Sequence, residues 1–155
     1  NIKKHSIEFN TIQYIKHFYQ LSDSQYKLLS IKARSLDLRI IQVIESRLDV
    51  LLFRLQFASS IFQARDFIKQ GIVFINMEKC LDKNTIVKLG SQISINPIKI
   101  TKNKLKFASC DYNPIIGANY LLTNKFNSAI FIKYPEINSI NLPLNLDITK
   151  LPGAI

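Results

Sequence analysis

The feature that most constrains the fold is a change of hydrophobic period near the middle of the chain. A stripe of apolar residues at helical spacing comes first and comprises Ile44, Leu48, Leu51, Leu52 and Leu55. A second, shorter helix is expected from Ile61 to Gln70, capped by Ser59 or Ser60 and followed by Gly71 at the position that favours a left-handed backbone. Residues 72–75 then form a β-branched run typical of a buried strand. Helices followed by short strands predict an α+β fold.

Two further helices are expected before this block. Apolar residues recur at helical spacing from Thr11 to Tyr19. Ser22 and Gln25 have the spacing of a capping box, which predicts a helix that runs to about Ser35. Asp37 is expected to cap the helix that follows. The amino-terminal part of the chain is therefore predicted to be helical.

Strand patterns return towards the carboxyl end, at residues 120–122 and 129–132. The predicted organisation begins with a helical region at 1–42. A central module at 43–97 follows, with two helices packed on a small, mostly antiparallel sheet. Residues 98–155 are expected to supply a basic linker, the two further strands and an extended carboxyl-terminal tail.

The charge of the chain restricts its partners. The sequence has 155 residues, with 21 Lys and Arg against 11 Asp and Glu, a net charge of +10. A compact chain with this excess repels itself unless an anionic partner lies against it. Nucleic acid is the first expectation and an anionic membrane surface the second. No run of about 18 apolar residues occurs, so no membrane span is predicted.

The residues that usually carry catalysis or metal binding are sparse. Cys80 and Cys110 do not form a C-x-x-C pair, and His5 and His17 lie in a different part of the chain. A structural zinc ion needs about four closely spaced ligands, so no metal or other cofactor is predicted. Reduced thiols are favoured over a single disulfide, which stays open. Paired carboxylates, a Gly-rich phosphate loop and a Ser/His/Asp set are also missing, and no catalytic residue is predicted.

Cations gather on the two helices of the central module. Arg47 and Arg54 lie two turns apart on the first helix, and Arg65 and Lys69 lie one turn apart on the second. Ser60 opens the second helix, whose amino-terminal end attracts anions. Two crossing helices would bring these groups to one cationic surface suited to the phosphates of folded RNA. The alternative is that each cation belongs to an ordinary solvated helix face.

A series of residues between 45 and 90 matches a known pattern in order and spacing. The series is Glu45, Ser46, Arg47, Leu48, Asp49, Arg54, Leu55, Phe57, Ala58, Gln63, Ala64, Arg65, Ile68, Gly71, Val73, Ile75, Asn76, Val87, Lys88 and Gly90. It resembles the RNA-binding module of the ribosomal protein S4 family. The flanking residues are similar to those that surround the module in ribosomal protein S4 itself: Leu21, Ser22, Gln25, Tyr26, Lys32 and Ala33 before it, and residues 120–122, 142–143 and 147–148 after it.

The resemblance implies a structural component of the small ribosomal subunit. Such a protein binds a multi-helix junction of small-subunit ribosomal RNA near the messenger-RNA entry, beside other small-subunit proteins. It is not an enzyme, a membrane protein or a homo-oligomer. By matched position, RNA contact is expected at Arg47, Arg54, Ser60, Gln63, Arg65, Lys69, Asn76 and Lys79. Asp49 is expected to be structural, bonded to backbone or to a neighbouring arginine.

The sequence departs from the family pattern at several positions. Gln56 and Met77 stand where the family usually has glycine, Ile61 where it has a basic residue, and Ser91 where it has aspartate. This erosion, together with heavy use of Ile, Asn, Lys and Phe, favours a mitochondrial location. A plastid or a bacterial cytoplasm is the alternative.

Two other functions remain open. S4 modules also occur in stand-alone RNA-binding or ribosome-rescue factors and as appendages of RNA-modifying enzymes. The second class needs a catalytic domain, for which too few residues remain outside the module. The basic run with Lys99, Lys102, Lys104 and Lys106 suits either a solvated loop or an RNA backbone.

Overall fold

The computed structural model describes residues 2–96, 121–124, 128–136, 140 and 142, with backbone alone for 2–8 and 121–124. The described residues form two compact units. One comprises residues 2–44 with 136, 140 and 142, and the other lies within residues 45–135. The lysine run at 99–106 and the tail from 143 onward lie outside the described residues. The predicted three-part division of the chain stays a prediction.

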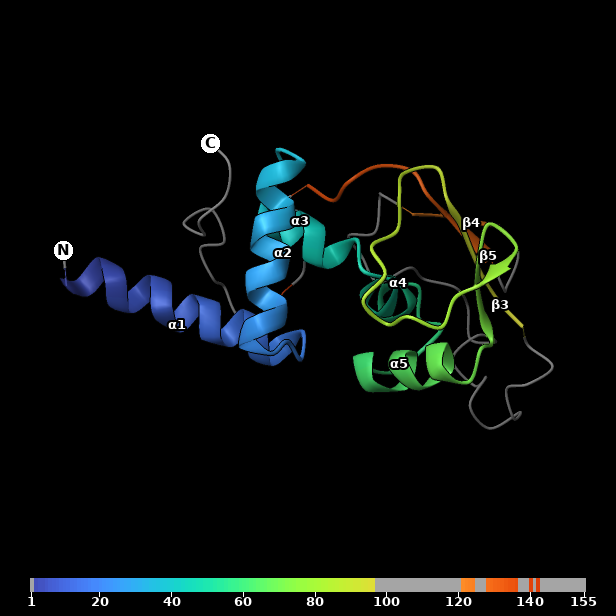
Figure 1. The fold of residues 1–155 in the computed structure, drawn as a ribbon, viewed down its shortest axis with the longest axis horizontal. Coiled ribbons are helices and arrows are strands. Elements are labelled where there is room, and N and C mark those ends of the chain that lie inside the picture. The colour runs from blue at the N-terminus through green and yellow to red at the C-terminus, as the bar shows by residue number, and fades with distance from the viewer. Residues whose placement is uncertain (1, 97–120, 125–127, 137–139, 141, 143–155) are drawn as a thin grey trace. The chain divides into compact units, whose positions relative to one another are not determined.

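The amino-terminal unit is helical, as predicted. Its helices are α1 (Ile2–Phe18), α2 (Asp23–Ser35) and most of α3 (Ile40–Glu45), and α1 begins earlier than the pattern from Thr11 indicated (Figure 1). The capping box is confirmed, because the Ser22 Oγ accepts from the Gln25 N–H at 3.3 Å and the Gln25 Oε1 accepts from the Ser22 N–H at 3.1 Å. The Lys16 ammonium donates to Asp23 and holds the pKa of that carboxyl below its ordinary value.

Asp37 does not cap α3, contrary to the prediction. Its φ is +53°, and its N–H donates to the carbonyl of Arg34 just past the end of α2. At the start of α3 it is instead the Gln42 side chain that accepts from the Arg39 N–H, at 3.1 Å. Asp37 therefore belongs to the turn that ends one helix, two residues too early to start the next.

The predicted stripe from residue 44 to 55 is divided between two helices. Helix α3 ends at Glu45 and α4 spans Leu48–Arg54. The backbone between them is extended and pairs with a distant segment: the Leu48 N–H donates to Thr85, and the Val87 N–H donates to the Ser46 carbonyl. Arg47 therefore precedes α4 and does not share a helix face with Arg54.

The second unit contains the two helices and the small sheet predicted for residues 43–97, together with two strands from the part predicted as 98–155. Helix α5 spans Ile61–Lys69, and Ser60 caps it as expected. The strands are β1 (Val73–Ile75), β2 (Glu78–Lys79), β3 (Gln92–Ile95), β4 (Leu121–Asn124) and β5 (Ser128–Phe131). They form one antiparallel sheet in the order β2-β1-β3-β5-β4. The fold class predicted for this part of the chain is confirmed.

The core of this unit lies between the two helices and the sheet. The helices contribute Leu48, Leu51, Leu52, Leu55, Ala64, Phe67 and Ile68, and the strands contribute Val73, Ile93, Ile95, Ala129 and Phe131. In β3 the buried Ile93 and Ile95 alternate with half-buried polar residues, as a strand with one covered face requires. This packing fixes α4 and α5 as a rigid support for the polar groups described next.

Candidate nucleic-acid interface

A buried carboxylate joins two of the predicted RNA-binding arginines. Arg47 donates from Nε and Nη2 to the two carboxylate oxygens of Asp49, at 3.0 and 2.9 Å. Arg65, one helix away, donates from Nε to Asp49 at 2.8 Å. Asp49 is fully buried, and the two guanidinium groups offset the cost of removing its charge from water. The expectation that Asp49 is structural is confirmed.

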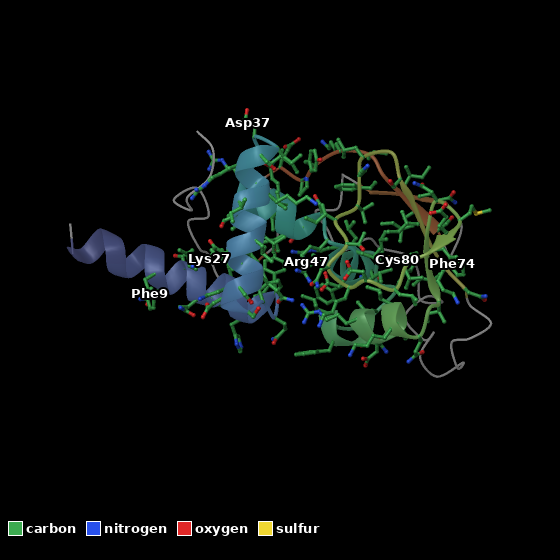
Figure 2. All side chains as sticks on the ribbon, in the orientation of Figure 1. Phe9, Lys27, Asp37, Arg47, Phe74 and Cys80 are labelled. Atoms are coloured by element: carbon green, nitrogen blue, oxygen red, sulfur yellow. The ribbon has the colours of Figure 1, made fainter. Side chains whose placement is uncertain are left out.

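Arg54 is held by a different carboxylate. Its Nε and Nη2 donate to Glu45 at 3.1 and 2.6 Å, and Glu45 is fully buried. Arg47 and Arg54 are themselves only 1% and 6% exposed (Figure 2 labels Arg47, just before α4). Both guanidinium groups thus neutralise buried carboxylates, and RNA contact at these two arginines stays a prediction.

Ser60 and Gln63 close the amino-terminal end of α5. The Ser60 Oγ accepts from the Gln63 N–H at 3.2 Å. The Gln63 side-chain oxygen accepts from the N–H of Ser59 at 2.6 Å and from its hydroxyl at 2.9 Å. These bonds satisfy backbone groups that a helix start leaves without partners. Whether either side chain also contacts RNA remains a prediction.

Two of the predicted cations are exposed, and Arg65 is largely buried. Lys69 is exposed in the last turn of α5 and Lys79 is exposed on β2, whereas the Arg65 side chain is 12% exposed. The aliphatic stem of Lys79 passes over Gly71, where an added Cβ would lie 3.1 Å from its Cδ and Cε. Lys69 on α5 and Lys79 on β2 therefore both lie near the carboxyl-terminal end of α5, whose dipole favours positive charge.

Asn76 holds the turn between β1 and β2 against the sheet. Its Oδ1 accepts from the Gln92 N–H at 2.9 Å, and its own N–H donates to the Gln92 carbonyl at 2.9 Å. The residue is exposed, with φ of +49°. Contact between this turn and RNA stays a prediction.

The predicted convergence of four cations on one surface is only partly seen. Arg47 and Arg65 meet at one carboxylate, whereas Arg54 pairs with another. Lys69 shares the outer side of α5 with Arg65, one turn away. We call the outer side of α5, formed by Phe62, Arg65, Asp66 and Lys69, the α5 face.

Phe62 is the member of the α5 face that the sequence analysis missed. Its side chain is 57% exposed, although it stands beside the buried Ile61 in an otherwise regular amphipathic helix. The sequence patterns used above were cations and apolar stripes, and Phe62 is neither a cation nor part of the apolar stripe of α5. Ile61 and Ala64 are both buried. An aromatic residue between them, off the apolar stripe of the helix, was the signal that could have identified Phe62.

Other kinds of site find no support in the described part of the chain. No group of three or more His, Cys, Asp and Glu side chains there is placed to hold a metal ion. None of its helices is both long and apolar enough to cross a membrane.

Residues 46–93 match the family model described as the S4 domain. The chain is 31% identical to the small ribosomal subunit protein uS4 of Carsonella ruddii over 146 residues, which cover 90% of this chain and 72% of that protein. It is 28% identical to the small ribosomal subunit protein uS4m of Reclinomonas americana, covering 90% of this chain and 60% of the relative. With the small ribosomal subunit protein uS4c of Toxoplasma gondii the identity is 40%, over 57% of this chain and 46% of the relative. The chain thus spans about half to three fifths of the length of the last two proteins.

Proposed function

Because the chain belongs to the S4 family of small-subunit ribosomal proteins, we propose that it is a structural constituent of a small ribosomal subunit and binds the RNA of that subunit. The observation that carries the proposal is the similarity to uS4 along 90% of the chain, which extends well beyond the RNA-binding module. The net charge of +10 supports an RNA partner, because a polyanion relieves the self-repulsion of such a chain.

In this proposal the RNA lies along α5 and along the turn between β1 and β2. Arg65, Lys69 and Lys79 supply charge to phosphates, and Ser60, Gln63 and Asn76 supply polar contacts. Arg47 and Arg54 stabilise the module beneath this interface by pairing with buried carboxylates. A buried guanidinium in a bidentate pair exposes little surface to a phosphate. Contact between RNA and these two arginines would require their ion pairs to rearrange.

The finer parts of the proposal rest on the family resemblance. The RNA target is a multi-helix junction near the messenger-RNA entry, and the neighbours are other small-subunit proteins. The role is non-enzymatic, and the chain forms no homo-oligomer. The predicted division into an amino-terminal helical region, an S4 module and a carboxyl-terminal part is retained.

A mitochondrial ribosome is the proposed location. The similarity to the uS4m protein of Reclinomonas americana supports it, as does the heavy use of Ile, Asn, Lys and Phe. Relatives named uS4c and uS4 keep the plastid and the bacterial cytoplasm as the alternatives.

Binding to a transcript of the 5′ domain of small-subunit ribosomal RNA tests the proposal. We expect the affinity to fall steeply with salt, because phosphate contacts release counterions. Arg65→Ala should cost about 1–3 kcal/mol and reduce the salt slope by about one. The matched control is Lys27→Ala, which removes the same charge from an exposed position on α2. Equal losses in the two variants would mean that only net charge matters and would remove Arg65 from the interface.

Sedimentation separates a ribosomal constituent from a stand-alone rescue factor. A constituent remains with small subunits after a high-salt wash, whereas a factor that visits the ribosome is released. Turnover in a modification assay on naked ribosomal RNA would contradict the non-enzymatic role.

A further inference from the structure

Phe62 is an exposed aromatic residue on the face of α5 that carries the cations. Its side chain is 57% exposed, while the other side of the helix buries Ile61, Ala64, Phe67 and Ile68 in the core. It precedes Arg65 and Asp66 by about one turn and Lys69 by two, so the four residues are neighbours on the helix surface. The core of the module therefore does not explain why an aromatic side chain stands here.

The groups around Phe62 favour a nucleic-acid partner over an apolar protein surface. Arg65 and Lys69 lie on the same face, and Asp66 is the carboxylate beside them. RNA-binding proteins combine cations for the phosphates with aromatic rings on which unpaired bases stack. A protein partner would have to bury these charges next to the ring, which carries a desolvation cost.

We propose that Phe62 is a stacking platform for an unpaired base of the ribosomal RNA, flanked by phosphates at Arg65 and Lys69. The inference rests on the proposed function and adds a base contact to an interface otherwise made of charge and hydrogen bonds. A base is bound by its π-face, so the contact tolerates different bases and adds no phosphate contact.

Phe62→Leu and Phe62→Trp test the platform on the same ribosomal RNA transcript. Phe62→Leu keeps an apolar side chain and should weaken binding roughly tenfold, because stacking of one base on an aromatic ring is lost. Its salt slope should equal that of the unsubstituted chain, since no charge has changed. The chain contains no tryptophan, so Phe62→Trp supplies the sole indole fluorophore. We expect this variant to bind at least as tightly as the unsubstituted chain, with its emission quenched by the RNA.

Phe9 provides the matched control. It is also a strongly exposed phenylalanine, at 61%, but lies on α1 (Figure 2). Phe9→Leu should leave the affinity unchanged, and the emission of Phe9→Trp should not be quenched. Equal losses in Phe62→Leu and Phe9→Leu would overturn the assignment of a specific platform to Phe62.

The remaining outcomes separate the inference from the function on which it rests. If Arg65→Ala weakens binding and Phe62→Leu does not, the platform is wrong and the RNA-binding function stands. Failure of the unsubstituted chain to bind the transcript would remove both. If the F62W emission changes only inside assembled subunits and not on naked RNA, the ring faces a neighbouring protein and the stacking proposal is overturned.

Discussion

At the scale of single residues, Asp49 organises the polar side of the module. One buried carboxylate accepts hydrogen bonds from Arg47, from Arg65 and from the Val50 N–H. It thereby ties the segment before α4 to α5. The ion pair with Asp49 fixes the Arg65 guanidinium at the edge of the α5 face. The phosphate contact expected at Arg65 therefore depends on the Asp49 carboxylate, which is itself buried.

Asp49→Ala should lower the free energy of unfolding by about 3–5 kcal/mol, because two partly or fully buried guanidinium groups lose their counter-charge. Urea unfolding measures the loss. Asp66→Ala is the control, since Asp66 is exposed and should change stability by roughly 0.5 kcal/mol at most. Similar stabilities for the two variants would contradict the assigned role of Asp49.

Tyr26 is a residue whose hydroxyl is buried without a hydrogen-bond partner among the described residues. Burial raises the pKa of this phenol, because the tyrosinate would be poorly solvated. The neutral form is therefore favoured by folding, and its contribution to stability is present below the ordinary tyrosine pKa and is lost as the pH rises through the higher folded value.

Tyr26→Phe removes the unsatisfied hydroxyl and should raise the free energy of unfolding by about 1 kcal/mol at neutral pH. The difference should widen above about pH 10, since only the tyrosine can ionise. Thermal unfolding at pH 7 and pH 10.5 checks both statements. A loss of stability in the phenylalanine variant would mean that the hydroxyl has a partner.

At the scale of elements, four helices end in the same way. The residue after the cap has a positive φ, and two backbone N–H groups turn back to the last carbonyls, the pattern of a Schellman motif. The residues at this position are Gln20 after α1, Asp37 after α2, Gln56 after α4 and Gly71 after α5, with φ of +53°, +53°, +58° and +66°. Glycine, the residue that adopts this backbone without strain, is present at one of the four.

Gln56→Gly should raise the free energy of unfolding by about 1 kcal/mol, because it relieves the left-handed strain of a residue with a Cβ. Gly71→Ala is the reciprocal change and should destabilise by more than about 1 kcal/mol. Its Cβ would also meet the Lys79 stem at 3.1 Å. Denaturant unfolding measures both changes, and a destabilised Gln56→Gly variant would show that the glutamine side chain contributes more than its backbone costs.

Helix ends were predictable from the sequence where local patterns determine them, and not where distant residues do. The capping box at Ser22, the helix cap at Ser60 and the left-handed Gly71 after α5 follow from local patterns, and all three were predicted. The break before α4 was not, because it depends on pairing with residues 85–87, which no local pattern records. For the same reason the burial of Arg47 and Arg54 was unforeseen: their partners became evident only once the helices were placed.

Gln56 and Met77 are changes that the sequence shows but whose effect on the backbone it does not. Both stand where the S4 family usually has glycine, and both retain the positive φ that glycine would adopt, +58° and +71°. The fold therefore keeps its turns although the residues have changed. Such exchanges are visible in the sequence, but their strain is visible only in the backbone.

At the scale of the whole molecule, the second unit has an apolar cluster of its own. The apolar cluster of the second unit consists entirely of residues between 48 and 134, from α4, α5 and the sheet with the segments that join them. The ion pairs of Asp49 with Arg47 and Arg65, and of Glu45 with Arg54, also lie within residues 45–135. Among the described residues, this cluster and these ion pairs are therefore formed within the second unit itself.

A fragment of residues 45–135 should therefore fold by itself. It retains Glu45, without which Arg54 would be a buried, uncompensated charge and stability would fall by about 3–5 kcal/mol. We expect a cooperative thermal transition followed by circular dichroism, which reports one domain with its own core. The matched control is the same fragment with Glu45→Ala, which should melt at a lower temperature or fail to fold. If residues 45–135 show no cooperative transition while the full chain does, the amino-terminal helices are part of the folding unit, and the S4 module cannot act as an autonomous RNA-binding support.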